Sequence, residues 1–274
     1  MLATGSTTVE IKSGYGLDSD SELRLLDAAA ELARQGDLPE VVATFMPLHA
    51  TPDGDKAGFV DEVCSRWLPR VPPHARFVDA FCDNGAYSVE ECLRLFIAAR
   101  AFGLRPKLHA DQRSNQGGAL LAANIGAVSA DHLEHSTDDE LRALASAGVV
   151  GVILPGASLV LGGPPPPGRR LLEAGARVAV ATDCNPGTCY SESMPLMVSL
   201  AVATGGLPPA EALVAATAGG AAALALGDRG MLRPGLRCDL ALLDSPHWID
   251  VAYHLGAAVV RAVVSGGRVV AGVS

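Results

Sequence analysis

The sequence predicts an α/β protein of the (β/α)8-barrel type, built from parallel strands that alternate with helices. Short apolar runs recur seven times, and each is followed by a polar or Gly-rich segment and then by a helix-like stretch. The runs are rich in β-branched residues and almost continuously apolar, which is typical of strands buried on both faces of a parallel sheet. At 274 residues the chain is long enough for one large domain. Seven units are one fewer than the eight that close such a barrel.

The expected units follow one another along residues 1–225, which we predict to form an incomplete barrel domain. The strands are expected at 7–14, 41–50, 75–83, 105–111, 126–133, 149–156 and 176–185. The helices are expected at 19–35, 56–69, 88–103, 115–126, 137–148, 168–175 and 191–206. Alternating elements of this length predict right-handed crossovers between parallel strands.

Start and stop signals mark several of these helices. Three segments fit the capping box, in which a hydroxyl and a carboxylate bind free backbone N–H groups at the helix start. They are Ser19 with Glu22, Ser88 with Glu91, and Thr137 with Glu140. Glycines occupy positions expected for left-handed helix ends. These are Gly103, Gly126 and Gly148.

The pattern changes after residue 225, and we expect 226–274 to form a small β portion. Two apolar stretches there have glycine turns and no amphipathic helix between them. The segment "SGGR" at 265–268 indicates a tight turn between two strands. Such a sheet is too small to hold a core alone.

Composition excludes several functional classes. The formal net charge of −9 argues against a nucleic-acid-binding protein, which normally carries a basic face. No apolar run reaches the roughly 18–20 residues that span a bilayer, and the start of the chain lacks a signal-peptide pattern. The six cysteines are scattered without a C-x-x-C pair, which favours reduced thiols over disulfides or a zinc–cysteine site. We therefore expect a cytoplasmic protein that does not bind membranes.

Polar residues at the ends of the predicted strands are the candidates for chemistry, because reacting groups in such barrels project from the C-terminal strand ends. They are Tyr15, His49, Asp83, His109, His132 and Asp183. Taken singly, a strand-end histidine is usually structural, and a strand-end aspartate often caps the next helix. The coincidence of His109, His132 and Asp183 instead indicates a metal site. Imidazole and carboxylate together suit Zn²⁺ or Fe²⁺, which lowers the pKa of water.

Several strings, in this order, resemble the imidazolonepropionases, a family of the amidohydrolase superfamily. They are "EIKSGYGL", "ATFMPLHA", "KLHADQ", "GAVSADHL", "ILPG" and "ATDCNPGT". The resemblance runs from residue 7 to about residue 270. It implies a metal-bearing (β/α)8 barrel beside a small β-sandwich. It also implies hydrolysis of 4-imidazolone-5-propanoate to N-formimidoyl-L-glutamate, a step of histidine breakdown.

The resemblance also implies roles for individual residues. His109 and Asp183 match metal-ligand positions, and one divalent metal, Zn²⁺ or Fe²⁺, is implied. His132 matches a histidine that faces the metal-bound water, so His132 and Asp183 are the implied catalytic residues. The implied substrate contacts are Tyr15, His49, Gln112, Asn185, Gly187 and Thr188. A small molecule is the implied partner, and a homodimer is considered.

One departure from the family pattern concerns the metal. The family's first strand ends in a His-x-His pair that supplies two more ligands, and this sequence contains no His-x-His. The expectation is therefore a barrel that lacks its first strand, followed by a remnant of the β-sandwich, and a chain that is nearly inactive alone. Two alternatives stay open: another cyclic amidohydrolase or deaminase, and a non-catalytic fragment. At position 112 some members carry Glu, whereas the Gln112 amide cannot act as an acid or base.

Overall fold

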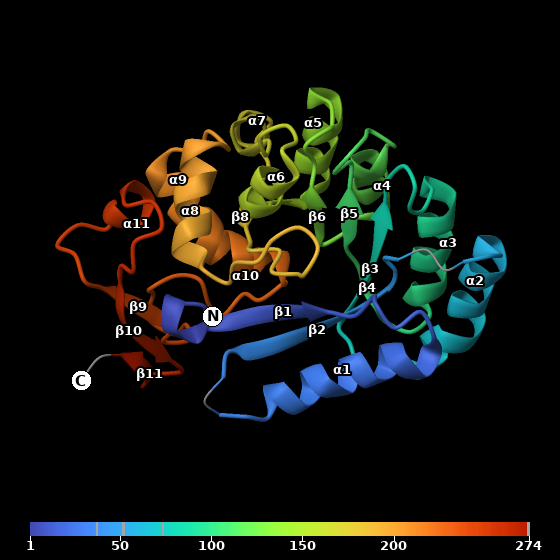
Figure 1. Ribbon diagram of the computed structural model, residues 1–274, viewed down its shortest axis with the longest axis horizontal. Coiled ribbons are helices and arrows are strands. Elements are labelled where there is room, and N and C mark those ends of the chain that lie inside the picture. The colour runs from blue at the N-terminus through green and yellow to red at the C-terminus, as the bar shows by residue number, and fades with distance from the viewer. Residues whose placement is uncertain (37, 51–52, 73, 273–274) are drawn as a thin grey trace.

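A curved parallel sheet with helices on its outer side forms most of the molecule (Figure 1). The computed structural model describes residues 1–36, 38–50, 53–72 and 74–272. Seven parallel strands pair in chain order, β1-β2-β3-β5-β6-β7-β8, and the short β4 pairs with β3. Their bounds are β1 Thr8–Lys12, β2 Glu40–Leu48, β3 Phe77–Cys82, β4 Arg105–Pro106, β5 Leu108–Ala110, β6 Ser129–His132, β7 Val150–Ile153 and β8 Val178–Val180.

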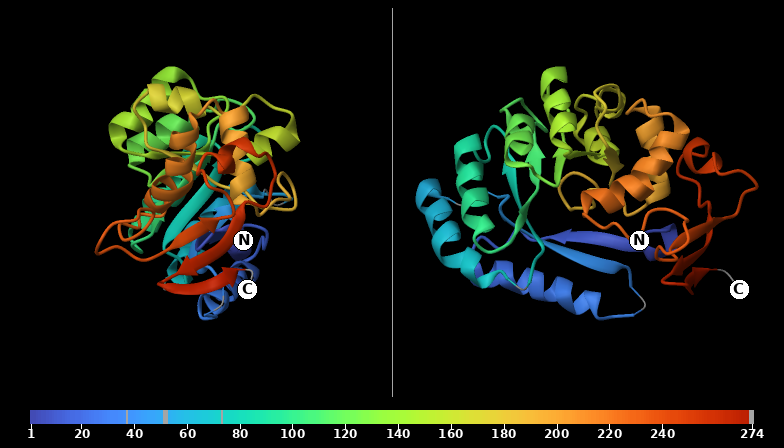
Figure 2. Two further views of the ribbon diagram at one scale, coloured as in Figure 1. Left: turned by 90° about the vertical axis from the view of Figure 1, so that its left-hand side faces the viewer. Right: turned by 180° about the vertical axis from the view of Figure 1, so that it is seen from behind.

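The strand order has a direct consequence for the barrel. Each crossover adds the next strand on the same side, so the sheet curls in one direction, and Figure 2 shows the resulting open barrel. In the part of the chain that the structure describes, β1 and β8 are the two ends of the path and do not pair with each other. The predicted seven parallel strands are therefore present.

Most of the helices cover the outside of the sheet. Their bounds are α1 Ser19–Ala33, α2 Lys56–Glu62, α3 Val89–Arg100, α4 Gly118–Ile125, α5 Asp138–Ala147, α6 Pro155–Leu161, α7 Gly168–Glu173, α8 Met194–Ala203, α9 Pro209–Val214, α10 Gly220–Ala223 and α11 Asp250–Tyr253. Of these, α11 packs on α8 and α9. Short 3-10 or π turns add Leu2–Thr4, Val63–Trp67, Leu68–Arg70 and Ala215–Gly219. Apolar side chains between helices and strands, such as Leu95, Leu141 and Leu171, form the main core.

Two of the three predicted capping boxes are present. Ser88 and Glu91 cap α3 reciprocally, and Thr137 and Glu140 cap α5 in the same way. The prediction for Ser19 and Glu22 is wrong, because Asp18 caps α1 by accepting from the backbone N–H of Ser21. Glu22 is buried and turned toward the preceding loop, where its Oε1 accepts from Gly14 N (3.1 Å) and Gly16 N (2.6 Å). That carboxylate therefore holds the "SGYG" loop instead of the helix end.

The predicted helix ends are also mostly correct. Gly126 and Gly148 are left-handed C-caps of α4 and α5. Gly103 has a positive φ of 74°, but α3 is capped by Ala101, two residues earlier. The helical segment at 209–223 was not predicted. It packs on β8 closely enough that a Cβ at Gly219 would lie 2.1 Å from the carbonyl oxygen of Val178, so only glycine fits there.

A second, antiparallel sheet follows the barrel strands. It contains β9 Leu240–Leu243, β10 Val260–Ser265 and β11 Arg268–Gly272, in the order β11-β10-β9. Gly266 and Gly267 both have positive φ and form the tight turn that "SGGR" predicted. The expectation of no helix here was incomplete, since the one-turn α11 precedes β10. Residues 273–274 of the predicted 226–274 portion lie outside the described residues.

Two exclusions from the sequence can be compared with the structure. Among the described residues, no helix has the length and apolarity that crossing a membrane requires. All six cysteines are free thiols.

Candidate active site

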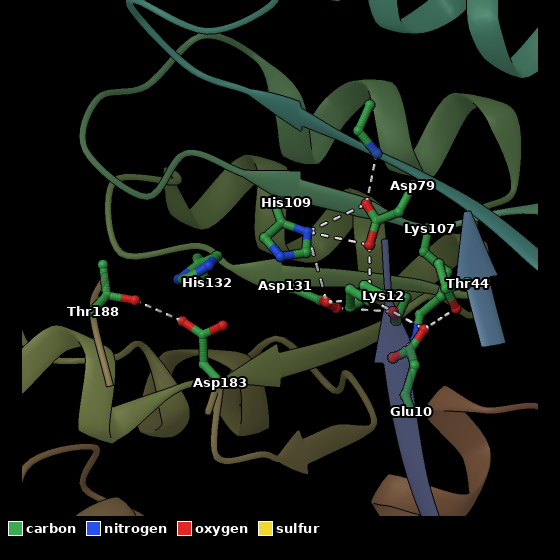
Figure 3. A network of polar contacts seen from close by, with 12 residues as sticks. Glu10, Lys12, Thr44, Asp79, Lys107, His109, Asp131, His132, Asp183 and Thr188 are labelled. Carbon is green, nitrogen blue, oxygen red and sulfur yellow. Dashed lines mark hydrogen bonds and ion pairs between the residues drawn. The ribbon is translucent and has the colours of Figure 1, made fainter. Parts of the chain in front are cut away.

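The C-terminal strand ends bring three of the predicted site residues together. His109 lies on β5, His132 ends β6, and Asp183 follows β8. One potential ligand atom from each lies within 4.8 Å of the others. Both histidines are buried and Asp183 is half-buried. Figure 3 shows His132 and Asp183 on one side of the His109 ring and Asp79 on the other.

A carboxylate holds the orientation of His109. Nδ1 of His109 lies 3.3 Å from Oδ1 and 3.2 Å from Oδ2 of Asp79, which is fully buried on β3. Burial opposes a charge on His109, but the Asp79 carboxylate outweighs burial and raises the pKa of His109. Because Nδ1 is engaged, Nε2 is the ring nitrogen left to face His132 and Asp183.

Behind Asp79 lies a network of buried ion pairs inside the barrel, which we call the inner ion cluster: Glu10, Lys12, Asp79, Lys107 and Asp131. The Lys12 ammonium lies 2.7 Å from Asp79, 3.1 Å from Glu10 and 3.4 Å from Asp131. Lys107 donates to Glu10 over 2.6 Å. Burial disfavours the Lys12 charge, yet these carboxylates raise the pKa of Lys12 well above its usual value.

Charged residues in the strand sequences are a signal for this cluster. The members lie in or beside short strands of the sheet, within the strings "VEIK", "VDAF", "PKLH" and "SADH", and Lys107 falls between β4 and β5. A charge within a buried strand is costly unless it is paired. Several such charges of both signs in neighbouring strands therefore indicate mutual pairing inside the barrel.

On the other side of His109, His132 and Glu134 are close but not bonded. Nδ1 of His132 lies 3.9 Å from Oε2 of Glu134. Both atoms are buried, and neither has a hydrogen-bond partner. Oε1 of Glu134 accepts from the Ser158 hydroxyl at 2.6 Å. Burial lowers the pKa of His132 to about 4 and raises the pKa of Glu134 to about 7, so His132 is neutral near pH 7.

Backbone conformation also distinguishes this rim. His132 has a φ of 78° and Asp183 a φ of 49°, both in the left-handed region that non-glycine residues seldom adopt. Such conformations persist where surrounding contacts hold them, and they concentrate at functional sites. The sequence had no signal for this strain.

The loop after β8 is tied to itself. Oδ1 of Asn185 accepts from the N–H groups of Gly187 (2.8 Å) and Thr188 (2.7 Å). Nδ2 of Asn185 donates to the Asp183 carbonyl oxygen, and the Thr188 hydroxyl donates to Asp183 Oδ2 at 3.2 Å. Asn185 and Thr188 therefore hold Asp183 in place. The Gly187 N–H, which was predicted to contact substrate, donates to Asn185 here.

Aromatic rings line the mouth beside His109. Tyr15 stands edge-on to His49 with ring centroids 4.7 Å apart, and 58% of Tyr15 is exposed. His49 lies beside Phe81, which in turn contacts His109. Burial lowers the pKa of His49, whose Nδ1 is buried without a partner. Gly14 is required for this contact, because a Cβ there would lie 2.8 Å from His49 Cβ. Gln112 is half-buried just beyond β5.

Two strand-end carboxylates are structural. The Asp83 side chain accepts from Asn84 N, Arg113 N and Ser114 Oγ. The Asp111 side chain accepts from Gln116 N, Gly118 N, Ala119 N and Ser136 Oγ. Asp83, a candidate from its position, therefore joins two loops. Asp111 caps α4 and fixes the loop that follows His109.

The donor set fits a divalent metal on one side of His109 only. His109 and His132 offer imidazole nitrogen and Asp183 offers carboxylate oxygen, a set that suits Zn²⁺ or Fe²⁺. Asp79, His109 and Asp131 form a second such group. There, however, the Lys12 ammonium already lies between the two carboxylates. The group His109, His132 and Asp183 is therefore the better candidate for a metal site, and below it is called the rim group.

Sequence comparisons identify the family of the chain. Residues 23–271 match the model of the Amidohydrolase family. The chain is 47% identical over 268 residues to an imidazolonepropionase from Syntrophobacter fumaroxidans and 45% identical over 270 residues to one from Rubrobacter xylanophilus. These alignments cover 96% and 97% of this chain, but 63% and 65% of the two relatives. The chain thus spans a little under two thirds of their length.

Solved structures share the fold. A guanine deaminase from C. acetobutylicum with bound guanine superposes with a TM-score of 0.75 at 14% identity, covering 98% of this chain and 72% of that one. An atrazine chlorohydrolase from Arthrobacter aurescens TC1 complexed with zinc gives a TM-score of 0.70 at 20% identity, covering 98% and 69%. At these identities the likeness establishes the amidohydrolase fold.

Proposed function

Because this chain belongs to the imidazolonepropionases of the amidohydrolase family, we propose that its protein hydrolyses 4-imidazolone-5-propanoate to N-formimidoyl-L-glutamate. One observation carries the proposal beyond the sequence likeness. The rim group brings two imidazoles and a carboxylate within 4.8 Å at the C-terminal strand ends, where barrel enzymes hold their reacting groups.

The reaction needs a water oxygen bonded to the ring carbonyl carbon, cleavage of that carbon–nitrogen bond, and a proton on the departing nitrogen. Asp183 would accept the proton of the attacking water and pass it to that nitrogen. Thr188 and Asn185 hold Asp183 for this task. His132, neutral near pH 7, orients the water or stabilises the charge that develops on oxygen.

His109 and Asp183 would hold the metal, with Asp79 fixing the His109 ring from behind. When bound there, Zn²⁺ or Fe²⁺ polarises a carbonyl oxygen and lowers the pKa of water. Asp183 thus has two proposed roles, as a ligand and as a proton carrier.

The mouth supplies the proposed substrate contacts. Tyr15 and His49 would stack against the imidazolone ring. Gln112 would orient substrate or water, since an amide side chain acts as neither a general acid nor a general base near neutral pH. The Asn185–Thr188 loop would meet the propionate. Its N–H groups at Gly187 and Thr188 would have to leave Asn185 Oδ1 to do so.

The proposal is tested by assaying imidazolone hydrolysis and metal content together. Two proteins are compared: the 274-residue chain, and a version extended by the codons that precede Met1 in frame. We expect Asp183→Ala and His109→Ala to abolish turnover and to reduce bound metal. His74→Ala is the matched control, because His74 pairs with Asp27 away from the site and should matter little. Absence of hydrolysis in both parent proteins would overturn the proposal.

The alternative, another cyclic amidohydrolase or a deaminase, is tested by the same protein with a panel of cyclic amides and aminopurines. Preference for one of these over the imidazolone would favour the alternative.

We further propose a cytoplasmic protein with a barrel domain at 1–225 and a β-sandwich portion at 226–274. A homodimer is proposed for solution, and light scattering would measure it.

A further inference from the structure

We propose that Glu134 is a positioning residue for His132. Its carboxylate accepts a hydrogen bond from Nδ1–H of His132, so that the lone pair on Nε2 is the part of the His132 ring that acts within the rim group. The inference rests on the proposed function for the role of His132. The contact itself depends only on the fold. Glu134 belongs to no predicted set of ligands, catalytic residues or substrate contacts.

The geometry of the two side chains carries the proposal. Oε2 of Glu134 and Nδ1 of His132 are 3.9 Å apart, and both are buried atoms without a partner. Buried polar atoms in folded proteins nearly always have a partner, because an unpaired one costs stability. A shift of about 1 Å brings this pair to hydrogen-bond distance, and one bond then satisfies both atoms.

The surroundings hold Glu134 in that position. The Ser158 hydroxyl on α6 donates to Oε1 at 2.6 Å, so the other oxygen, Oε2, is the one left for His132. Glu134 itself is only 8% exposed, which limits competition from water. His132 is fixed from its own side by a left-handed backbone at the end of β6 and by the His109 ring, 5.3 Å away between centroids.

The chemical consequence concerns which nitrogen carries the proton. A neutral imidazole has one N–H and one lone pair, and the hydrogen bond at one nitrogen decides the state of the other. With Nδ1–H directed to Glu134, Nε2 accepts a hydrogen bond or a proton at the rim, so of the two roles proposed for His132 it supports orienting the water and not stabilising negative charge on oxygen. This matters here because Gln112, at the neighbouring strand end, cannot take a proton.

The tautomer is measured directly by NMR. The 274-residue chain is labelled with 15N-histidine, freed of metal with a chelator and held at pH 8. His132→Gln identifies the signal by its loss. We expect His132 to carry its proton on Nδ1. Glu134→Ala should change the tautomer ratio toward Nε2–H by about tenfold or more, the effect of losing a hydrogen bond to a charged group.

Two further variants sharpen the test. Glu134→Gln keeps an acceptor oxygen and should restore the Nδ1–H form. Glu140→Gln makes the same charge change in the α5 capping box, a few residues away, and should leave the tautomer unchanged. An Nε2–H form in the unaltered chain would overturn the proposal even if no variant folds. An unchanged ratio in a folded Glu134→Ala would also overturn it.

A kinetic readout separates this inference from the proposed function. If imidazolone is hydrolysed, Glu134→Ala should lower kcat by about a hundredfold with metal content unchanged, and Glu134→Gln should recover most of it. Unaltered kcat in Glu134→Ala would contradict the inference. If nothing is hydrolysed, the proposed function fails, whereas an Nδ1–H tautomer that depends on Glu134 still supports the positioning contact.

Discussion

The two sides of His109 differ in how their polar atoms are satisfied. On the inner side, the Lys12 ammonium lies within 3.4 Å of three carboxylates, and Lys107 pairs with Glu10. On the outer side, Nδ1 of His132, Oε2 of Glu134 and Nδ1 of His49 are buried without partners. The inner side chains are not the more buried ones: Lys12 and Glu10 are 21% and 15% exposed, against 2% and 4% for His132 and Glu134, so burial does not explain the difference.

This difference distinguishes the residues that support the fold from those expected to take part in the chemistry. Buried charges that satisfy one another have no capacity left for a ligand, and they fix the strands that carry them. Buried atoms without partners are unfavourable as they stand, so a small movement that pairs them is favoured, as proposed above for Nδ1 of His132 and Oε2 of Glu134. The inner ion cluster therefore orients His109, and the outer side is where chemistry is expected.

The largest loss of stability is expected from removing a member of the inner ion cluster. Asp79→Ala leaves the Lys12 ammonium and the His109 ring without their main partner. Removing one member of a buried ion pair typically costs about 3–5 kcal/mol of unfolding free energy. Urea unfolding measures this, with the exposed Asp139→Ala as the matched control. A loss below about 1 kcal/mol would show that the cluster does not stabilise the barrel.

A smaller change, this time a gain in stability, is expected from substituting Glu134 on the outer side. The pKa of Glu134 is raised by burial to about 7 from 4.5, so its contribution to stability is present below pH 4.5 and lost as pH rises through 7. Glu134→Gln removes this loss and should gain about 1–3 kcal/mol relative to the parent between pH 5 and pH 8. Parallel urea titrations at the two pH values test it. If Glu134→Gln and the parent differ in unfolding free energy by the same amount at pH 5 and at pH 8, the pKa of Glu134 is not raised.

The smallest loss of stability is expected from removing an exposed hydrogen bond at a helix end. Ser88→Ala removes the capping box of α3, which includes no predicted site residue, and should cost about 1 kcal/mol. Thermal unfolding measures the loss, and metal content should stay the same. A cost as large as that of Asp79→Ala would mean that burial does not distinguish the two kinds of contact.

Sequence patterns predicted the seven parallel strands and the strand-end positions of His109, His132 and Asp183, because apolar runs and their polar ends are local features. Their meeting at one rim was an inference from parallel topology, and in the structure one ligand atom of each lies within 4.8 Å of the others. The capping boxes at Ser88 and Thr137 were also local and correct. Ser19 was misjudged because Glu22 is drawn to N–H groups of the preceding loop, a contact that no local pattern encodes.

By itself, then, the sequence determined the order of strands and helices, the residue types at each strand end, and membership of a family. Only the tertiary structure decided which of those residues have partners. Asp83 and Asp111 proved to be loop anchors, Asn185 holds its own loop, and Glu134 faces His132. The physical reason is that hydrogen bonds and ion pairs act over about 3 Å, so a role depends on neighbours that the chain brings together from distant positions.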